Sequence, residues 1–211
     1  ANSKVDYLVH VGYNYYHLGQ GLGTHTVHVK GYVGGSIAES HHMGVNVTNN
    51  TLLYMSNTEK QSPRNHLHLE PFYHYKNNKL LIHAGINLDF MLGNHFAFAP
   101  SPQVMVEWMA DPEMVSLYIN AIGSYNMNSP KSIMEENRYV APSFLMNDSN
   151  STYKPIQADL GFKIKPVNGL LITPYISFSH FRNDVFYQFN TATMSYSCFN
   201  MNASVFDAGL T

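Results

Sequence analysis

The chain has few charged residues and a single cysteine. Only 12% of its 211 residues are Asp, Glu, Lys or Arg, and the Lys and Arg residues form no basic run. We therefore expect no nucleic-acid partner, because nucleic-acid-binding domains carry clustered positive charge. Cys198 stands alone, which excludes an internal disulfide framework and a zinc site built from the cysteines of this chain.

Long hydrophobic runs are also missing. No stretch approaches the roughly 18 consecutive apolar residues of a transmembrane helix. Residues 1–4 contain no apolar signal core, so we expect that the sequence starts inside a longer protein, or that a signal peptide was removed. Any membrane crossing must therefore be made by strands, which hydropathy averaging does not detect.

The sequence does contain strict alternation of apolar and polar residues. Residues 80–90 are the clearest case: one face is apolar and the other carries His83, Asn87 and Asp89. Residues 156–164 alternate in the same way. Segments of about ten alternating residues are long enough to cross a bilayer when they are tilted. A charged residue turned toward lipid near the bilayer midplane would cost roughly 2–4 kcal/mol, so the apolar face must be the lipid-facing one.

This pattern predicts an all-β fold, a transmembrane antiparallel up-and-down β-barrel with about ten strands in this chain, complete or part of a larger barrel. The predicted strands are residues 5–16, 25–34, 41–54, 65–75, 79–90, 97–109, 114–125, 153–165, 169–181 and 192–206. Tight turns are predicted at 76–78, 110–113 and 166–169, and longer links at 55–64, 91–97 and 126–152. Short and long connections alternate, as in bacterial outer-membrane barrels.

We predict one domain over residues 1–211, or a fragment of a larger barrel, with 126–152 as a long extracellular loop. Ser132 and Glu135 have the spacing of a capping box after Pro130, which predicts a short helix over 132–138 in that loop. Pro71 and Pro174 each remove a ladder donor, so each is expected at an edge, a bulge or a strand end.

Four segments give the chain a family resemblance. They are WMADPEMVSLY (108–118), MEENRYVAP (134–142), LGFKIK (160–165) and YISFS (175–179). Together they resemble the C-terminal barrel half of TonB-dependent receptor-like outer-membrane proteins of Bacteroidetes. The resemblance implies a location in the bacterial outer membrane, a plug region before residue 1 and further strands after Thr211. Two departures are that no plug or energy-coupling box precedes Val5, and that residues 208–211 lack a terminal aromatic residue.

Histidine is abundant, with twelve residues. His66, His68 and Glu70 are spaced two apart, so on a strand they share one face and could present imidazole and carboxylate ligands to a divalent metal. The alternative is that they are polar lumen residues without a metal. We predict no other cofactor.

We expect no enzymatic activity. Ser179 and His180, with Asp89 or Asp184, could be combined into a hydrolytic site, but the sequence has no Gly-x-Ser-x-Gly elbow. The glycine-rich residues 19–23 join two predicted strands, so we interpret them as a hairpin loop and not as a phosphate cradle.

Three functional hypotheses follow. The first is a barrel that acts in solute uptake or as a subunit of an outer-membrane transport complex, with an unknown solute. The second is an accessory or scaffold barrel that binds other outer-membrane or periplasmic proteins. The third is a soluble secreted β-sandwich binding protein, in which the apolar faces pack on each other and five Asn-x-Ser/Thr triplets are glycosylated. For the first two, outer-membrane lipid is the expected surrounding.

Overall fold

The computed structural model describes residues 5–19, 22–55, 62–111, 113–140, 144, 150–192 and 194–211. Its elements, in chain order, are β1 (Val5–Gly19), β2 (Leu22–Ala38), β3 (His41–Met55), β4 (Arg64–Lys76), β5 (Leu80–Leu92), β6 (Ala97–Asp111), β7 (Val115–Met127), α1 (Pro130–Glu136), β8 (Ser151–Val167), β9 (Leu170–Ile172), β10 (Pro174–Asn190) and β11 (Ser195–Leu210).

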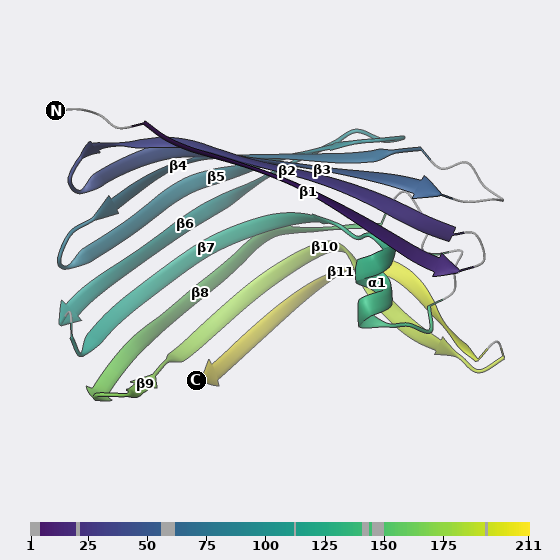
Figure 1. Cartoon of the computed structure of the whole chain (residues 1–211). Helices are drawn as coiled ribbons and strands as arrows, with labels where there is room; N and C mark the ends of the chain where they lie inside the picture. Colours follow the sequence, from purple (N-terminus) through teal and green to yellow (C-terminus); the bar gives the residue numbers. More distant parts are fainter. Residues whose placement is uncertain are drawn as a thin grey trace.

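The strands form one antiparallel sheet in which neighbours in sequence are neighbours in space (Figure 1). The hydrogen-bonded path runs from β1 through β8 to β10 and β11, and the short β9 pairs with β8 beside that path. The sheet is curved like part of a cylinder wall (Figure 1). An antiparallel, up-and-down, all-β architecture was predicted from the alternation and is confirmed.

The sheet buries its polar face and exposes its apolar face, an arrangement that we call inverted exposure. Along β5, Asn87 and Asp89 are buried, whereas Ile86, on the opposite face of the strand, is 44% exposed. On β7, Ile119 is 51% exposed. The polar side chains therefore lie on the inside of the curve, and the apolar ones point outward without a second protein layer over them in the described residues. The β-sandwich hypothesis, which requires those apolar faces to pack together, is wrong.

Pro174 explains where the strand count differs from the prediction. Residues 169–181 were predicted as one strand, but the structure divides them into β9 and β10, with Pro174 as the first residue of β10. A strand start tolerates proline because its missing N–H is not needed in the ladder. Pro71 stays inside β4, and there the pairing with β5 skips from Leu69 to Phe72.

The connections between strands lie at two ends of the sheet. Residues 39–40 and 77–79 join strands at the end where β1 begins and β11 ends (Figure 1). β3 ends and β4 begins at the other end, where β7 also ends and β8 begins. The strand bounds leave a long link between β7 and β8 as predicted, but the link between β5 and β6, predicted to be long, has only residues 93–96. Residues 20–21, 56–61, 112, 141–143 and 145–149 lie outside the described part.

The helix begins earlier than predicted. α1 starts at Pro130, and its N-cap is Ser129, whose Oγ accepts a hydrogen bond from Ser132 N at 3.1 Å. Ser132 Oγ in turn accepts from Ser129 N at 2.9 Å, which closes the capping box. The predicted box of Ser132 with Glu135 is wrong because Pro130, with its fixed φ and absent N–H, suits the first helical position. No helix in the described residues is both long and apolar enough to span a membrane.

Candidate functional site

The inner face carries a buried polar cluster near the end with the long connections. Its centre is Asp89 on β5, which is 1% exposed. The same Asp89 oxygen, Oδ1, lies 2.8 Å from His66 Nε2 and 2.8 Å from His68 Nδ1, both on β4. Oδ2 of Asp89 is buried and has no hydrogen-bond partner among the described residues. Two imidazoles thus share one carboxylate oxygen while the other oxygen stays available.

Strand register produces this arrangement. His68 is directly opposite Asp89, and His66 is opposite Met91 on the same face. Opposed residues on neighbouring antiparallel strands have Cβ atoms about 4.5–5.5 Å apart, so a short side chain such as Asp can reach both imidazoles. The cluster extends across the sheet, because Asn87 Nδ2 donates to Gly123 O on β7 at 2.8 Å.

Glu70 belongs to a neighbouring group. Its Oε2 accepts from Asn46 Nδ2 at 2.9 Å, and its Oε1 lies 3.3 Å from His83 Nε2. His83 is directly opposite His74. His74 is opposite His42, so three imidazoles form a row across β3, β4 and β5. This row and the Asp89 pair make the inner face of β3 to β5 rich in imidazole.

The predicted metal ligands are therefore only partly brought together. His66 and His68 meet at Asp89, whereas Glu70 contacts His83 and Asn46. As the side chains stand, no three His, Cys, Asp or Glu residues of the described part have the geometry of a metal site. Assignment of a metal to His66, His68 and Glu70 stays a prediction.

A second set of charged groups lies on the inner face of β6 to β8. Glu107 accepts from Lys163 Nζ at 2.7 Å through Oε2 and from Ser116 Oγ at 2.7 Å through Oε1. On β8 and β10, Ser177 Oγ donates to Asp159 Oδ1 at 2.5 Å. Charged side chains on this face are paired across strands, which reduces the cost of burying them.

The connection between β7 and β8 folds back onto the sheet. Buried Ile133 of α1 and Val140 form a small apolar core, against which Tyr187, Tyr196 and Cys198 of the β10–β11 hairpin pack. Tyr187 Oη donates to Glu136 Oε2 at 2.7 Å. This hairpin lies beyond the irregularity between Phe181 and Asp184.

The half of the β10–β11 hairpin next to its connection lies beyond the apolar band of the sheet. Polar residues such as Gln188, Asn190 and Ser197 are present there, and Ile133 and Val140 of the β7–β8 connection pack against it. Burial in the small core and the nearby Glu136 carboxylate raise the pKa of the Tyr187 hydroxyl. Burial raises the pKa of the Cys198 thiol to about 11. Cys198 is therefore a protonated packing residue at neutral pH.

The residues considered for hydrolysis are not assembled. His180 Nδ1 contacts Ser204 Oγ at 2.9 Å, Asp184 Oδ1 accepts from Thr152 Oγ1 at 3.1 Å, and Asp89 is taken by two histidines. The sequence analysis missed the partnership of Asp89 with His66 and His68, and the His42–His74–His83 row. Pairing the predicted 65–75 and 79–90 strands around their Asn-Asn turn would have brought Asp89 near His68.

An open, curved antiparallel sheet with a polar inside and an apolar outside has the fold of a transmembrane outer-membrane β-barrel. Among solved structures, the chain is similar to one described as copper transporter OprC, with a TM-score of 0.59 and 12% sequence identity. The match covers 90% of this chain and 34% of that one, so this chain spans about a third of the transporter's length. No protein-family model matches the sequence, and neither does any curated protein.

Proposed function

We propose that the chain is part of the wall of a bacterial outer-membrane barrel of the TonB-dependent receptor kind, acting in solute uptake or as a subunit of a transport complex. The observation that carries this proposal is the inverted exposure, with Asp89 buried on the inside and Ile86 and Ile119 open on the outside. Apolar side chains exposed to water raise the free energy of the folded state, whereas hydrocarbon around the outer face removes that cost. The Bacteroidetes character of the resemblance remains a sequence-based proposal.

Connection lengths support an orientation. In bacterial barrels the short turns are periplasmic and the long loops extracellular. We therefore assign residues 126–152, with α1, to the extracellular side.

The edges of the sheet support a larger assembly. Among the described residues, β1 and β11 are the two ends of the hydrogen-bonded path, and the connection between β7 and β8 pairs with the start of β11, where Tyr196 N donates to Tyr139 O at 2.9 Å. Each unpaired backbone group in lipid costs several kcal/mol. Further strands, from the same protein or from an outer-membrane partner, would remove that cost.

The single tryptophan offers a direct test. Trp108 lies on the outer face of β6 and is 51% exposed. Purified protein should require detergent, should migrate differently on gels before and after heating, and its Trp108 fluorescence should be quenched by brominated phospholipids. A matched indole on the inner face, made by Tyr118→Trp in a Trp108→Phe background, should escape quenching. A monodisperse, detergent-free monomer would refute the proposal.

A metal solute is a second, narrower proposal. One solved structure that the chain resembles is described as a copper transporter, and imidazole suits copper and zinc. Binding at His66 and His68 would require their rings to turn away from Asp89, with Glu70 or Asp89 supplying the carboxylate. Calorimetric titration with Zn²⁺ or Cu²⁺ should show binding that His66→Ala/His68→Ala abolishes and that His180→Ala, on the outer face, leaves intact. An absence of binding to the parent protein would dispose of this proposal.

A further inference from the structure

The inner face of β4 ends in a group of nitrogen donors beside the short β4–β5 turn. His74 lies in the imidazole row of β3 to β5, and Lys76 follows two positions later on the same face of the strand. Lys79 is on that face too, because its backbone oxygen accepts from Met109 N at 2.7 Å, and Met109 is two positions beyond the inner-face residue Glu107. Three side chains with N–H donors therefore gather at one place on the inside of the wall.

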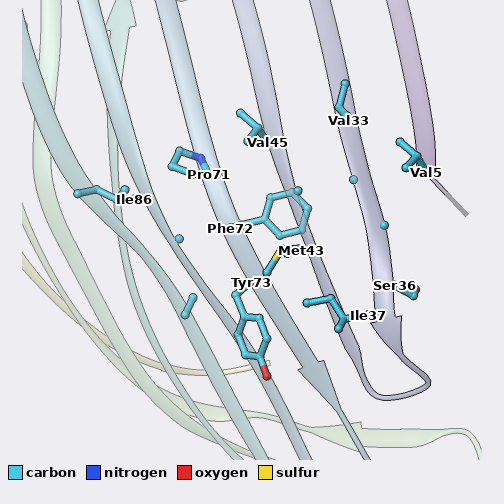
Figure 2. Close-up of a pocket in the computed structure, with 15 residues that line it drawn as sticks. Val5, Val33, Ser36, Ile37, Met43, Val45, Pro71, Phe72, Tyr73 and Ile86 are labelled. Atoms are coloured by element: carbon cyan, nitrogen blue, oxygen red, sulfur yellow. The ribbon is translucent and has the colours of Figure 1, made fainter. Parts of the chain in front are cut away.

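The outer side of the same strands has a different character. Figure 2 shows Val45 of β3 and Ile86 of β5 there, bordering an apolar hollow of about 1010 Å³. The charged residues of β4 are Arg64, Glu70 and Lys76, and their even spacing places all three on the inner side. A ligand that is recognised by charge in this part of the sheet must therefore approach from the inside.

The β4–β5 turn holds the two lysines in place. Asn77 Oδ1 accepts from Lys79 N at 2.8 Å and from Leu80 N at 2.7 Å, and Asn77 N donates to Leu80 O at 2.9 Å. Lys76 N donates to Ser40 O at 3.0 Å, which ties this turn to the neighbouring β2–β3 turn. The backbone that carries both ammonium groups is thus ordered, so less conformational entropy is lost when they bind a ligand.

The three donors have no partners within the described part of the chain. No carboxylate there lies within ion-pair distance of the ammonium group of Lys76 or Lys79. Neither ring nitrogen of His74 has a hydrogen-bond partner in those ranges. The inner-face carboxylates of β4 and β6, Glu70 and Glu107, already have imidazole or lysine partners. The group therefore offers unused N–H bonds together with unpaired positive charge.

Charge decides which kind of ligand suits this group. Glu39 on the adjacent β2–β3 turn is exposed and offsets at most one of the two ammonium charges, so the place stays positive. His74 is within electrostatic range of the other two imidazoles of its row and of Lys76. The ammonium group of Lys76 would repel a metal ion on that row, whereas it would attract an oxoanion, which would also accept the unused N–H bonds.

We propose that His74, Lys76 and Lys79 form a binding site for the phosphate or sulfate group of a small solute. The imidazole N–H and the two ammonium groups donate to the oxygens of the anion from the inside of the wall. The inference rests on the proposed role of the chain in solute uptake, and it deepens that role by naming a chemical class of solute. The site is separate from the proposed metal site, whose histidines are nearer the other end of β4.

Calorimetric titration of the full chain in detergent tests the site. Sodium sulfate or glycerol 3-phosphate is added at pH 7.5 and constant ionic strength, and both should bind, because the exposed lysines leave room for a substituent on the anion. His74→Ala and Lys76→Gln should each weaken binding by about tenfold, since a hydrogen bond to a charged group contributes about that factor. Lys76→Gln/Lys79→Gln should abolish binding, while the heat-modifiable folded band is kept.

Lys30→Gln is the matched control. It removes the same charge from the same face, and Lys30 is likewise exposed and has no carboxylate within ion-pair distance among the described residues. Lys30 is opposite Thr48 and His74 is opposite His42, so the two places are six residues, or about 20 Å, apart along β3. That separation exceeds the screening length of about 8 Å at physiological ionic strength. The control should therefore bind sulfate as the parent does.

The contrary outcomes are distinct. No heat of binding with a folded parent protein, or equal weakening by Lys30→Gln and Lys76→Gln, would overturn the anion site. Zn²⁺ binding that is lost in His74→Ala would make the imidazole row a metal site, and would also overturn it. Quenching of Trp108 by brominated phospholipids tests the outer face separately. Sulfate binding can therefore fail while the proposed function stands, and absent quenching of Trp108 would instead count against the proposed function.

Discussion

Arg64 Nη2 donates a hydrogen bond of 2.9 Å to the backbone oxygen of Asn150, although the two residues are 86 positions apart. Arg64 begins β4 and is 3% exposed, and Asn150 precedes β8 and is 1% exposed. Asn150 also donates from Nδ2 to Phe144 O at 2.7 Å and accepts at its backbone oxygen from Asn128 N at 3.0 Å. One buried guanidinium thus ties the long β7–β8 connection to a strand three positions away in the sheet.

Arg64→Ala should therefore loosen this connection. Hydrogen bonds to charged groups are worth about 1.5–3 kcal/mol, so opening of the segment should increase by about tenfold or more. Trypsin cleavage after the exposed Lys131 or Arg138, followed by mass spectrometry, reports that opening. Arg182→Ala, which removes an exposed arginine, serves as the control. An unchanged cleavage rate in a folded Arg64→Ala protein would show that the hydrogen bond from Arg64 to Asn150 does not hold the connection in place.

Asp89→Ala should destabilise the folded state by about 1–3 kcal/mol, because His66 and His68 lose a shared acceptor in a buried place. The measurement is the temperature at which the folded gel band converts to the unfolded one. Asp207→Ala is the matched control, since Asp207 is exposed and contacts Tyr175 Oη at 2.9 Å. If both substitutions lowered the conversion temperature equally, the Asp89 cluster would contribute no more to stability than an exposed contact.

Gly123→Ala should also lower that conversion temperature. A Cβ at this position would overlap Ser101 and would lie 2.8 Å from Pro155 O, so β7 and its neighbours must shift. Overpacking of this kind costs about 1–3 kcal/mol. Gly93→Ala, whose nearest neighbour would be Pro63 O at 3.6 Å, should leave the temperature unchanged. A neutral Gly123→Ala would mean that the sheet is less tightly curved at this point.

Cys198 should react slowly with iodoacetamide at neutral pH. Because burial raises its pKa to about 11, the neutral thiol is favoured and the reactive thiolate accumulates only as the pH approaches that value. The alkylation rate should therefore keep rising tenfold per pH unit past the ordinary thiol pKa of about 8.5. In Cys198→Ser/Ser197→Cys, with the thiol on an exposed position, the rate should level off near pH 8.5. Levelling at the same pH in both proteins would contradict burial of Cys198.

Alternation alone predicted which residues of β5 and β8 point outward from the sheet, because the two-residue period of an extended backbone is a local property that neighbouring strands do not change. The strand breaks were less predictable. Whether Pro174 divides or bends a strand depends on which neighbour needs its missing N–H, and that is decided by pairing with β8 and β11. Likewise, Ser129 and Pro130 mark the start of α1, but Ser132 and Glu135 also have the spacing of a capping box, so the sequence predicts two possible starts.

The sequence by itself determined the all-β class, the two-faced strands and the abundance of imidazole on the polar side, since these are properties of composition and period. Only the tertiary structure decided that Asp89, and not Glu70, joins His66 and His68, and that Arg64 holds Asn150. Each of these depends on strand register. Register is set by the sum of many cross-strand contacts and turn geometries, which no single segment encodes.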